Sequence, residues 1–263
     1  MVGCGACSFR LADYSIKLAN HMDAMILVGG KGERLKSIVP DRPKPMAEVA
    51  GRPFVEWLVL FLHTQGIKRV IFCTGYMSEV IEGYFRDGKD WGMEIVYSRE
   101  PMPLGTSGAV RYALDKVHSE RFLVLNGDSF CRFDLNRLNE AHLARRASLT
   151  LWLVGMEDCS RYGAVDIGDE DIVKAFREKT EERRAGLVNA GIYLLERRTV
   201  KSIPEGKAVS METEFIPAMV GHGLYAVVGN GPLIDIGIPE TYALAKQYFT
   251  THEQPMWIDE EER

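Results

Sequence analysis

Short apolar runs recur along the chain and alternate with segments whose apolar residues have helical spacing. Apolar runs of this length, bounded by turn residues, are typical of strands buried in a parallel sheet. They predict strands at residues 24–28, 70–74, 94–98, 122–126, 149–154 and 188–195. The helical patterns predict helices at residues 54–64, 78–85, 107–117 and 135–145. This alternation favours an α/β fold with a doubly wound, mainly parallel, Rossmann-like sheet flanked by helices.

The pattern changes after residue 150. Two strand-like segments, at residues 162–167 and 172–178, flank an acidic turn, and helical spacing returns at residues 211–220 and 239–249. No repeat or change of composition separates these segments from the first half of the chain. We therefore expect a single domain over residues 22–252.

The two ends of the chain differ from this domain. Residues 1–21 show no periodicity and contain no convincing signal peptide, which favours a disordered or non-native extension. Residues 253–263 are acidic and favour a frayed, solvated tail.

Composition narrows the class of protein and its partners. Of 263 residues, 46% are apolar and 26% charged, and the formal net charge is -5. This balance is ordinary for a globular protein and argues against a broad nucleic-acid-binding surface. Because no run approaches the roughly 20 apolar residues of a membrane span, a membrane is not an expected partner either. The five cysteines are scattered, so we expect no disulfide framework and a cytoplasmic location. Composition leaves homo-oligomerisation open.

The segment after the first predicted strand carries the strongest chemical signal. Gly29, Gly30 and Gly32 leave out side chains where the backbone must turn and approach a ligand. Backbone N–H groups in such a turn can bind an anion. Arg34 can fork onto phosphate oxygens, and Lys44, held between two prolines, supplies a point charge. The segment predicts phosphate binding, with a spacing that is neither that of a P-loop nor that of a dinucleotide site.

Two aspartates stand where predicted buried runs end. Asp128 follows the strand at residues 122–126, and Asp235 follows a second apolar run. Ligands of open α/β sheets bind outside the carboxyl ends of the strands. Mg²⁺ takes one or two carboxylates together with phosphate oxygens and water. Both aspartates are therefore candidate Mg²⁺ ligands, although each alone could be a turn former.

Several motifs, in order along the chain, resemble those of the sugar-1-phosphate nucleotidyltransferases, also called NDP-sugar pyrophosphorylases. The glycine-rich loop with its later Pro-Lys-Pro is similar to the family signature, and N-G-D and D-I-G are similar to its two metal-aspartate motifs. A base-binding segment and the sugar-side motifs Y-G, E-K and N-x-G complete the pattern. The matching residues are 29–35, 43–45, 103–109, 125–128, 162–163, 178–179, 188–192 and 234–237.

This resemblance implies a reaction and a role for each matched residue. The reaction is transfer of a nucleotidyl group from an NTP to a sugar 1-phosphate, with release of pyrophosphate. The implied nucleotide-binding residues are Leu27, Gly29, Gly30, Gly32, Gly105 and Thr106. The implied catalytic residues are Arg34 and Lys44. The implied sugar-phosphate-binding residues are Gly163, Glu178, Lys179 and Asn189, and Asp128 and Asp235 would hold the cofactor Mg²⁺.

The choice of substrates rests on finer details. The motifs most resemble the D-glycero-α-D-manno-heptose 1-phosphate guanylyltransferase branch of the family. Glu100 precedes the base-binding segment, and its carboxylate could accept hydrogen bonds from N1–H and the amino group of guanine, so we add it to the nucleotide site. An exposed loop charge is the alternative for Glu100. Mannose 1-phosphate guanylyltransferases and N-acetylmuramate 1-phosphate uridylyltransferases share most of these motifs. A catalytically silent sugar-nucleotide-binding regulatory protein is a further alternative, which the presence of both aspartates disfavours.

Overall fold

The computed structural model describes residues 22–35, 37–177 and 183–251. The extension and the acidic tail predicted from the sequence lie outside the described residues. The boundaries expected for a single domain stay a prediction.

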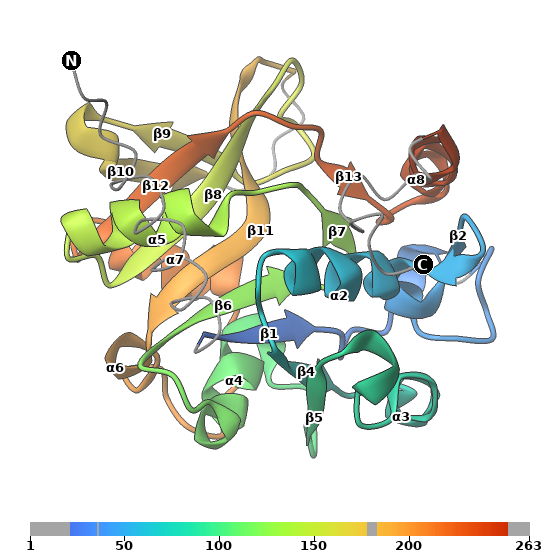
Figure 1. Ribbon diagram of the computed structural model, residues 1–263. Coiled ribbons are helices and arrows are strands. Elements are labelled where there is room, and N and C mark those ends of the chain that lie inside the picture. Colours follow the sequence, from blue (N-terminus) through green and yellow to red (C-terminus); the bar gives the residue numbers. More distant parts are fainter. Residues whose placement is uncertain (1–21, 36, 178–182, 252–263) are drawn as a thin grey trace, which may run out of the picture.

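Within the described residues, nine strands form one sheet (Figure 1). Its main path has the order β10-β9-β11-β6-β1-β4-β5, and β8 pairs with β11 and with β12. The bounds are β1 Asp23–Leu27, β4 Arg69–Thr74, β5 Glu94–Arg99, β6 Arg121–Asn126, β8 Leu149–Met156, β9 Ala164–Ile167, β10 Val173–Arg177, β11 Gly186–Glu196 and β12 Leu224–Gly229. Two small pairs lie apart from it, β2 (Glu48–Val49) with β3 (Arg52–Pro53) and β7 (Ser129–Phe130) with β13 (Ile234–Asp235).

The helices of the described residues connect these strands. The α-helices are α2 Phe54–Thr64, α3 Ser78–Phe85, α4 Gly105–Tyr112, α5 Leu135–Ala144, α6 Arg197–Val200, α7 Ile216–Met219 and α8 Pro239–Thr251. Short 3-10 turns are η1 Glu33–Leu35, η2 Lys44–Met46, η3 Lys89–Trp91, η4 Ala113–Lys116 and η5 Asp169–Asp171, and η6 (Met211–Phe215) is a π-helical turn.

The first half of the sheet is parallel, and the predicted fold class is confirmed. β1 pairs in parallel with β4 and β6, and β4 pairs in parallel with β5. β11 then runs antiparallel to β6, β8 and β9. The sheet is therefore mixed, with a mostly parallel core flanked by helices.

The second half differs from the sequence expectation at β12, at residues 211–220 and at the short helix α6. β12, which pairs in parallel with β8, was not predicted. The helix predicted at residues 211–220 is a π-helical turn followed by the short helix α7. Pro217 has no N–H to donate to the preceding turn, which interrupts the α-helical ladder there.

Side chains that alternate along β1 pack into two apolar cores. Ala24 and Ile26 belong to the core that includes α2, whereas Met25 belongs to the core that includes α4. All three are fully buried. Successive side chains of a strand point to opposite faces of the sheet, so α2 and α4 cover opposite faces (Figure 1).

The parallel register brings three strand ends into one row. Leu27 at the end of β1 is paired with Cys73 of β4 and with Asn126 of β6. Cys73 is 1% exposed, and burial raises the pKa of its thiol, so it serves as a small core residue. Because ligands of open α/β sheets bind at the carboxyl ends of strands, this row is the expected floor of a site.

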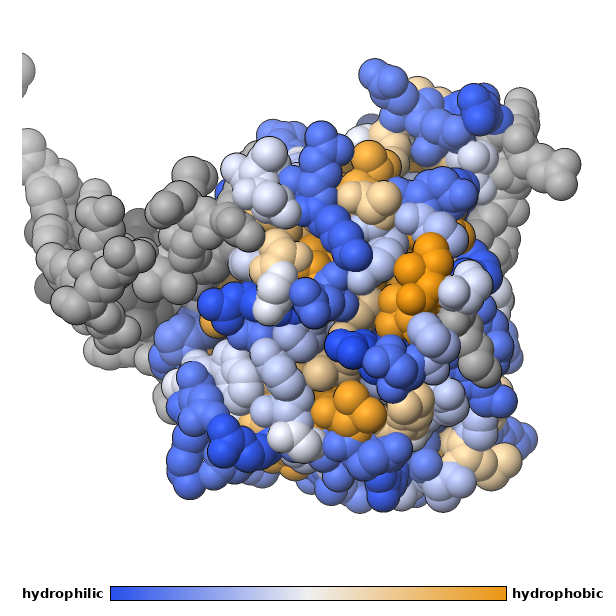
Figure 2. Space-filling view, turned by 90° about the vertical axis from the view of Figure 1, so that its right-hand side faces the viewer, coloured by the Kyte–Doolittle hydropathy of each residue, from blue (hydrophilic) through white to orange (hydrophobic). Residues whose placement is uncertain are grey.

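The face shown in Figure 2 is mainly hydrophilic, with apolar residues in separate patches. The large apolar side chains that are clearly exposed among the described residues are Ile38, Tyr84, Met102, Tyr112, Leu143 and Leu244. Scattered apolar residues are normal on a protein surface, so homo-oligomerisation stays a prediction. Over the described ranges, no helix combines the length and the apolar character needed to cross a membrane.

Helix α8 is attached to the domain through aromatic contacts. The ring of Phe249 stacks on Trp57, with ring centroids 4.7 Å apart. It also meets Phe54 and Phe130 edge to face, at 6.1 and 5.2 Å. Both arrangements are favourable for aromatic rings. Since α8 closely follows Asp235, its attachment helps to hold the loop that carries this aspartate.

We expect Phe249→Ala to lower the free energy of unfolding by about 3–5 kcal/mol, because a ring that is 1% exposed would leave a cavity. The control is Leu244→Ala in the same helix. Leu244 is 60% exposed, so its truncation should change stability by less than about 0.5 kcal/mol. Urea denaturation measures both, and equal effects of the two substitutions would contradict this packing.

Candidate active site

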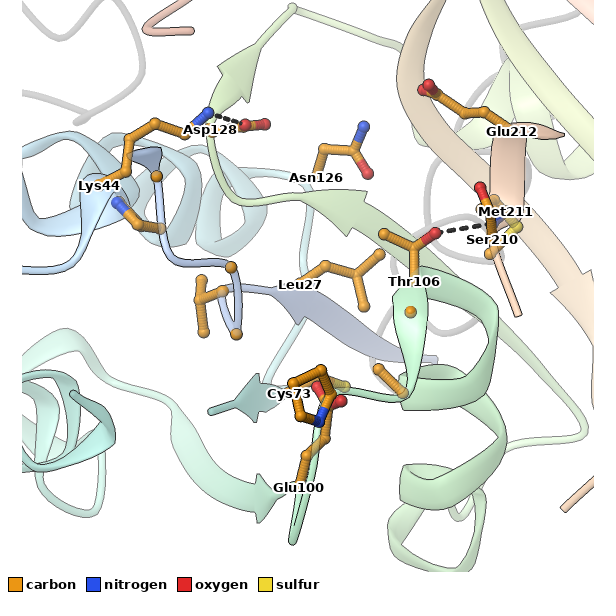
Figure 3. Close-up of a pocket in the computed structure, with 18 of the residues that line it drawn as sticks. Leu27, Lys44, Cys73, Glu100, Thr106, Asn126, Asp128, Ser210, Met211 and Glu212 are labelled. Carbon is orange, nitrogen blue, oxygen red and sulfur yellow. Dashed lines mark hydrogen bonds and ion pairs between the residues drawn. The ribbon is translucent and has the colours of Figure 1, made fainter. Parts of the chain in front are cut away.

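A cavity of about 500 Å³ opens at the row formed by Leu27, Cys73 and Asn126. Its wall contains the glycine-rich loop after β1, the first turn of α4 and residues 210–212 (Figure 3). Ten residues singled out from the sequence lie in this wall, namely Leu27, Gly29, Gly30, Gly32, Arg34, Lys44, Glu100, Gly105, Thr106 and Asp128. The cavity therefore brings together residues that are up to a hundred positions apart in the chain.

Close contacts shape the glycine-rich loop. Gly32 has a φ of +62°, and a Cβ at this position would lie 2.7 Å from the Cβ of Lys44. Glycine adopts this conformation at little cost, whereas a larger residue would displace Lys44. The N–H of Leu35 donates to the carbonyl oxygen of Gly32 at 3.0 Å, and the Leu35 side chain is buried. Leu35 thus anchors the end of the loop in the core while its glycines stay at the cavity wall.

Lys44 pairs with Asp128 inside the cavity. Pro43 is extended, with φ -66° and ψ 146°, and both it and Pro45 are buried. The Nζ of Lys44 and the carboxylate of Asp128 form an ion pair (Figure 3). The Lys44 side chain is 13% exposed and that of Asp128 is 39% exposed. The two prolines therefore hold a largely buried ammonium group at the end of β6.

Glu100 lies near Cys73, away from Lys44 (Figure 3). Its Oε2 accepts a hydrogen bond from the N–H of Leu104 at 2.8 Å. Burial raises the pKa of the Glu100 carboxyl, and the hydrogen bond from Leu104 opposes that rise. A Cβ on Gly29 would lie 2.9 Å from Oε1 of Glu100, so the side chain is close to the glycine-rich loop. Glu100 is a half-buried acceptor with a fixed position, and not an exposed loop charge.

The first turn of α4 is tied to a segment that follows it by about a hundred residues. Gly105 has a φ of +68°, and a Cβ there would lie 2.6 Å from the carbonyl oxygen of Val209. The N–H of Ser107 donates to that oxygen at 3.0 Å. Thr106 Oγ1 accepts a hydrogen bond from the N–H of Met211 at 2.7 Å. These bonds give hydrogen-bond partners to polar groups in the first turn of α4, and they place residues 210–212 beside the cavity.

A second cavity, of about 400 Å³, adjoins the first. Its wall contains Gly163, Asn189 and Asp235, all singled out from the sequence. The residues that line both cavities are Arg34, Lys44, Asn126, Asp128, Glu212 and Gly237. The predicted sugar-side residues Glu178 and Lys179 lie outside the described residues. Ligands in the two cavities would meet at the shared residues.

A small antiparallel pair of strands brings the two aspartates together. Asp235 of β13 is paired with Ser129 of β7, which directly follows Asp128. Asp235 accepts hydrogen bonds from the Tyr162 hydroxyl at 2.5 Å and from the Thr241 hydroxyl at 2.9 Å. Burial, and then the hydrogen bond to Asp235, raise the pKa of Tyr162, so its hydroxyl stays protonated as a donor. Asp235 is therefore held in one orientation beside Asp128.

The chemistry of this donor set fits Mg²⁺. Within the residues that the structure describes, no cluster of three or more His, Cys, Asp or Glu side chains could hold a metal ion. Two carboxylates are too few for a structural zinc site, which takes four protein ligands. They suit a Mg²⁺ ion that completes its coordination with water and substrate phosphates.

Asn189, expected to bind a sugar, is bound within the protein in this structure. It is 6% exposed, and its Nδ2 donates to the hydroxyl of Tyr193 at 2.7 Å and to Oε1 of Glu212 at 3.3 Å. Its Oδ1 accepts from the N–H of Gly191 at 3.1 Å. Glu212 was missed in the sequence, because no local pattern marks it. Its place depends on the long-range tie between α4 and Met211.

Comparisons with known proteins show which proteins this chain resembles. The family model described as "Nucleotidyl transferase" matches residues 23–252. The chain is 39% identical over 229 residues to "Mannose-1-phosphate guanylyltransferase" of Mycobacterium tuberculosis, covering 86% of this chain and 64% of that protein, which is less than two thirds of its length. It is 40% identical over 221 residues to "D-glycero-alpha-D-manno-heptose 1-phosphate guanylyltransferase" of Campylobacter jejuni, covering 84% of this chain and 97% of that protein.

A solved structure is also similar. The crystal structure of HddC from Yersinia pseudotuberculosis complexed with GMP-PN has a TM-score of 0.77 and 34% sequence identity to this chain. The match covers 87% of this chain and 99% of that one.

The burial of Glu100 predicts a pH-dependent effect of Glu100→Gln on stability. A carboxyl whose pKa is raised by folding destabilises the native state above that pKa, and the penalty fades as pH falls through it. Glutamine carries no charge and can still accept from Leu104. Without ligand, the variant should therefore gain stability over the wild type at about pH 7, and the gain should shrink towards about pH 4. Thermal denaturation at both pH values measures this, with the exposed Glu140→Gln as control. A loss of stability at neutral pH would contradict it.

Proposed function

The chain belongs to the nucleotidyl transferase family, and on that premise we propose that it transfers a guanylyl group from GTP to D-glycero-α-D-manno-heptose 1-phosphate, with release of pyrophosphate. The observation that carries the proposal is the pair of adjoining cavities whose shared wall contains Arg34, Lys44 and Asp128. A nucleotide would occupy the first cavity and a sugar 1-phosphate the second. Their phosphates would then meet where the positive side chains and the aspartates lie together.

The chemistry requires mainly positioning and cancellation of charge. An oxygen of the sugar phosphate attacks the α-phosphorus of GTP, the new O–P bond forms, and the bond to the β-phosphate breaks as pyrophosphate leaves with the electron pair. The attacking phosphate is already ionised at neutral pH, so no general base is needed. Arg34 can bind phosphate oxygens in a bidentate fashion, and Lys44 supplies a compact charge. Holding two anions in one orientation lowers the barrier through proximity and electrostatic stabilisation.

Asp128 and Asp235 would hold Mg²⁺ in this reaction. When bound, the ion would neutralise phosphate charge and orient the reactants. Lys44 pairs with Asp128 in the structure, so its ammonium group would turn towards the nucleotide phosphates when they enter. Glu178 and Lys179, the remaining sugar-side candidates, keep their proposed roles from the sequence, with Lys179 on the phosphate of the sugar.

The choice of GTP and of a manno-configured sugar rests on the relatives. Both the Campylobacter and the Mycobacterium relatives are named as guanylyltransferases, one for the heptose and one for mannose 1-phosphate. Mannose 1-phosphate is therefore the second candidate acceptor. We further propose a cytoplasmic location, because the scattered cysteines indicate no disulfide framework. A uridylyltransferase acting on N-acetylmuramate 1-phosphate is an outcome that the same assay can reveal.

The test is pyrophosphate release with Mg²⁺ over four NTPs and a panel of sugar 1-phosphates. The panel contains the heptose, mannose, glucose and N-acetylmuramate 1-phosphates. The highest kcat/KM should be found with GTP and the heptose 1-phosphate. A preference for mannose 1-phosphate would show that the proposed acceptor is wrong, and a preference for UTP would show that the proposed base is wrong. No pyrophosphate from any pair would favour the catalytically silent sugar-nucleotide-binding protein.

The metal proposal predicts that Asp128→Asn lowers turnover by about 100-fold or more, because one charged ligand is lost from the reacting phosphates. The substitution keeps the shape of the side chain but takes the ion-pair partner from Lys44, so the melting temperature should fall while the fold is kept, as circular dichroism can show. Mn²⁺ binding in the presence of GTP, followed by electron paramagnetic resonance, provides a second measurement. Turnover within threefold of the wild type at limiting Mg²⁺ would remove Asp128 from the metal site.

A second prediction concerns the base. If the Glu100 carboxylate accepts hydrogen bonds from guanine, Glu100→Gln would place a side-chain NH2 group, which is a donor, against the N–H groups of guanine. The variant should then lose about 1–3 kcal/mol of GTP binding, the usual cost of an unsatisfied buried group. Use of other nucleotides should barely change, since a site built for hydrogen bonds discriminates against analogues that lack them. Steady-state KM values for GTP and UTP measure the difference, and unchanged GTP kinetics would refute the role of Glu100.

A further inference from the structure

Glu212 lies in the walls of both cavities and has no role in the reaction described so far. It belongs to the π-helical turn η6 and is half buried. In Figure 3 it stands across the cavity from Lys44 and Asp128, on the same side as Thr106. A carboxylate at the meeting point of two anionic substrates needs a chemical reason, because it repels phosphate.

The backbone that carries Glu212 is held in place on both sides. The N–H of Met211 is bound to Thr106, which ties the start of the turn to α4. Ser210 Oγ accepts from the N–H of Thr213 at 3.2 Å, and Glu214 Oε1 accepts from the N–H of Ser210 at 2.8 Å. This reciprocal capping satisfies the first N–H groups of the turn. The turn therefore presents the Glu212 side chain from a fixed backbone.

The side chain is oriented as well. Asn189 Nδ2 donates to Oε1 of Glu212 at 3.3 Å, and the Asn189 amide is itself fixed by Tyr193 and Gly191. Asn189, Gly191 and Glu212 all line the second cavity. The carboxylate is thus held against the wall of the cavity that would take the sugar 1-phosphate.

An ionised carboxylate only accepts hydrogen bonds. A phosphate has no proton to offer it at neutral pH, whereas sugar hydroxyls are donors. Hydrogen bonds to a charged acceptor are about twice as strong as neutral ones, so one such contact can decide which sugar is held. The end of the first cavity that contains Glu100, where we propose that guanine binds, lies away from Glu212 (Figure 3).

We propose that Glu212 binds a hydroxyl group of the sugar 1-phosphate and is a specificity-determining residue for the acceptor. Asn189 is then a positioning residue, which acts on the sugar through the carboxylate that it orients. This inference rests on the proposed function, because it assigns the second cavity to a sugar phosphate. It adds a sugar contact on a turn that lies outside the motifs that first suggested the site.

The test compares Glu212→Gln with the wild type, using GTP and D-mannose 1-phosphate, whose ring has the manno configuration. The variant keeps the size of the side chain but loses its charge and one acceptor oxygen. The KM of mannose 1-phosphate should rise by about tenfold, the lower end expected for a lost charged hydrogen bond, while kcat and the KM of GTP stay within about twofold. Glu140→Gln is the matched control, since Glu140 is exposed, lies outside the turn that carries Glu212 and lines neither cavity. It should change neither KM.

Monodeoxy forms of mannose 1-phosphate separate a contact with the sugar from a structural role. With the form that lacks the hydroxyl bound by Glu212, wild type and variant should have similar KM values, because the interaction is already absent. With the other forms, the variant should keep its tenfold disadvantage. The same disadvantage with every form, or a larger rise in the KM of GTP, would overturn the assignment.

A binding experiment keeps this test independent of turnover. Mannose 1-phosphate is titrated calorimetrically into the wild type and into Glu212→Gln without any NTP. If the wild type releases no pyrophosphate from any substrate pair, the proposed function fails, yet weaker binding by the variant still supports Glu212 as a sugar contact. Equal binding by the two proteins, or none by the wild type, would overturn the inference.

Discussion

The parallel register of β1 with its neighbours β4 and β6 is the constraint on which the site depends. It aligns Leu27, Cys73 and Asn126, so that the loops leaving three strands begin in one row. Burial of β1 on both faces fixes that register, because a shift by one residue would exchange the side chains of the two cores. The register of the strands alone then brings the glycine-rich loop and the segment that ends in Asp128 together.

The two aspartates of the site each have a counterpart within the protein. Asp128 is paired with Lys44, and Asp235 is bound by the hydroxyls of Tyr162 and Thr241. A buried charge without a partner would be costly, so these contacts stabilise the site before any ligand enters. In the proposed reaction, Mg²⁺ and the substrate phosphates would exchange with these contacts at the two aspartates.

Much of this arrangement could be predicted from the sequence, because it is encoded locally. Apolar runs predicted the sheet, and the glycines, prolines and aspartates predicted the residues around the first cavity. The strand β12 was missed although its six residues form an apolar run bounded by glycines like those of the predicted strands, whereas its parallel pairing with β8 is a long-range contact. Local patterns could not predict the position of Glu212, because it is set by a hydrogen bond between Thr106 and Met211. Contacts between segments that are far apart in the chain could therefore not be predicted from local sequence patterns.

The tie between α4 and residues 209–211 has a consequence for the order of events during synthesis. The Ser107 N–H and the Thr106 hydroxyl find their partners only about a hundred residues later. A nascent chain that has exposed β1, β4, β5 and β6 thus has the strands of the parallel half of the sheet but an unfinished first cavity. Contacts of such long sequence separation form late and slowly. The wall of this cavity can be completed only after Met211 has left the ribosome, so a ligand of the first cavity would meet its full set of contacts only late in synthesis.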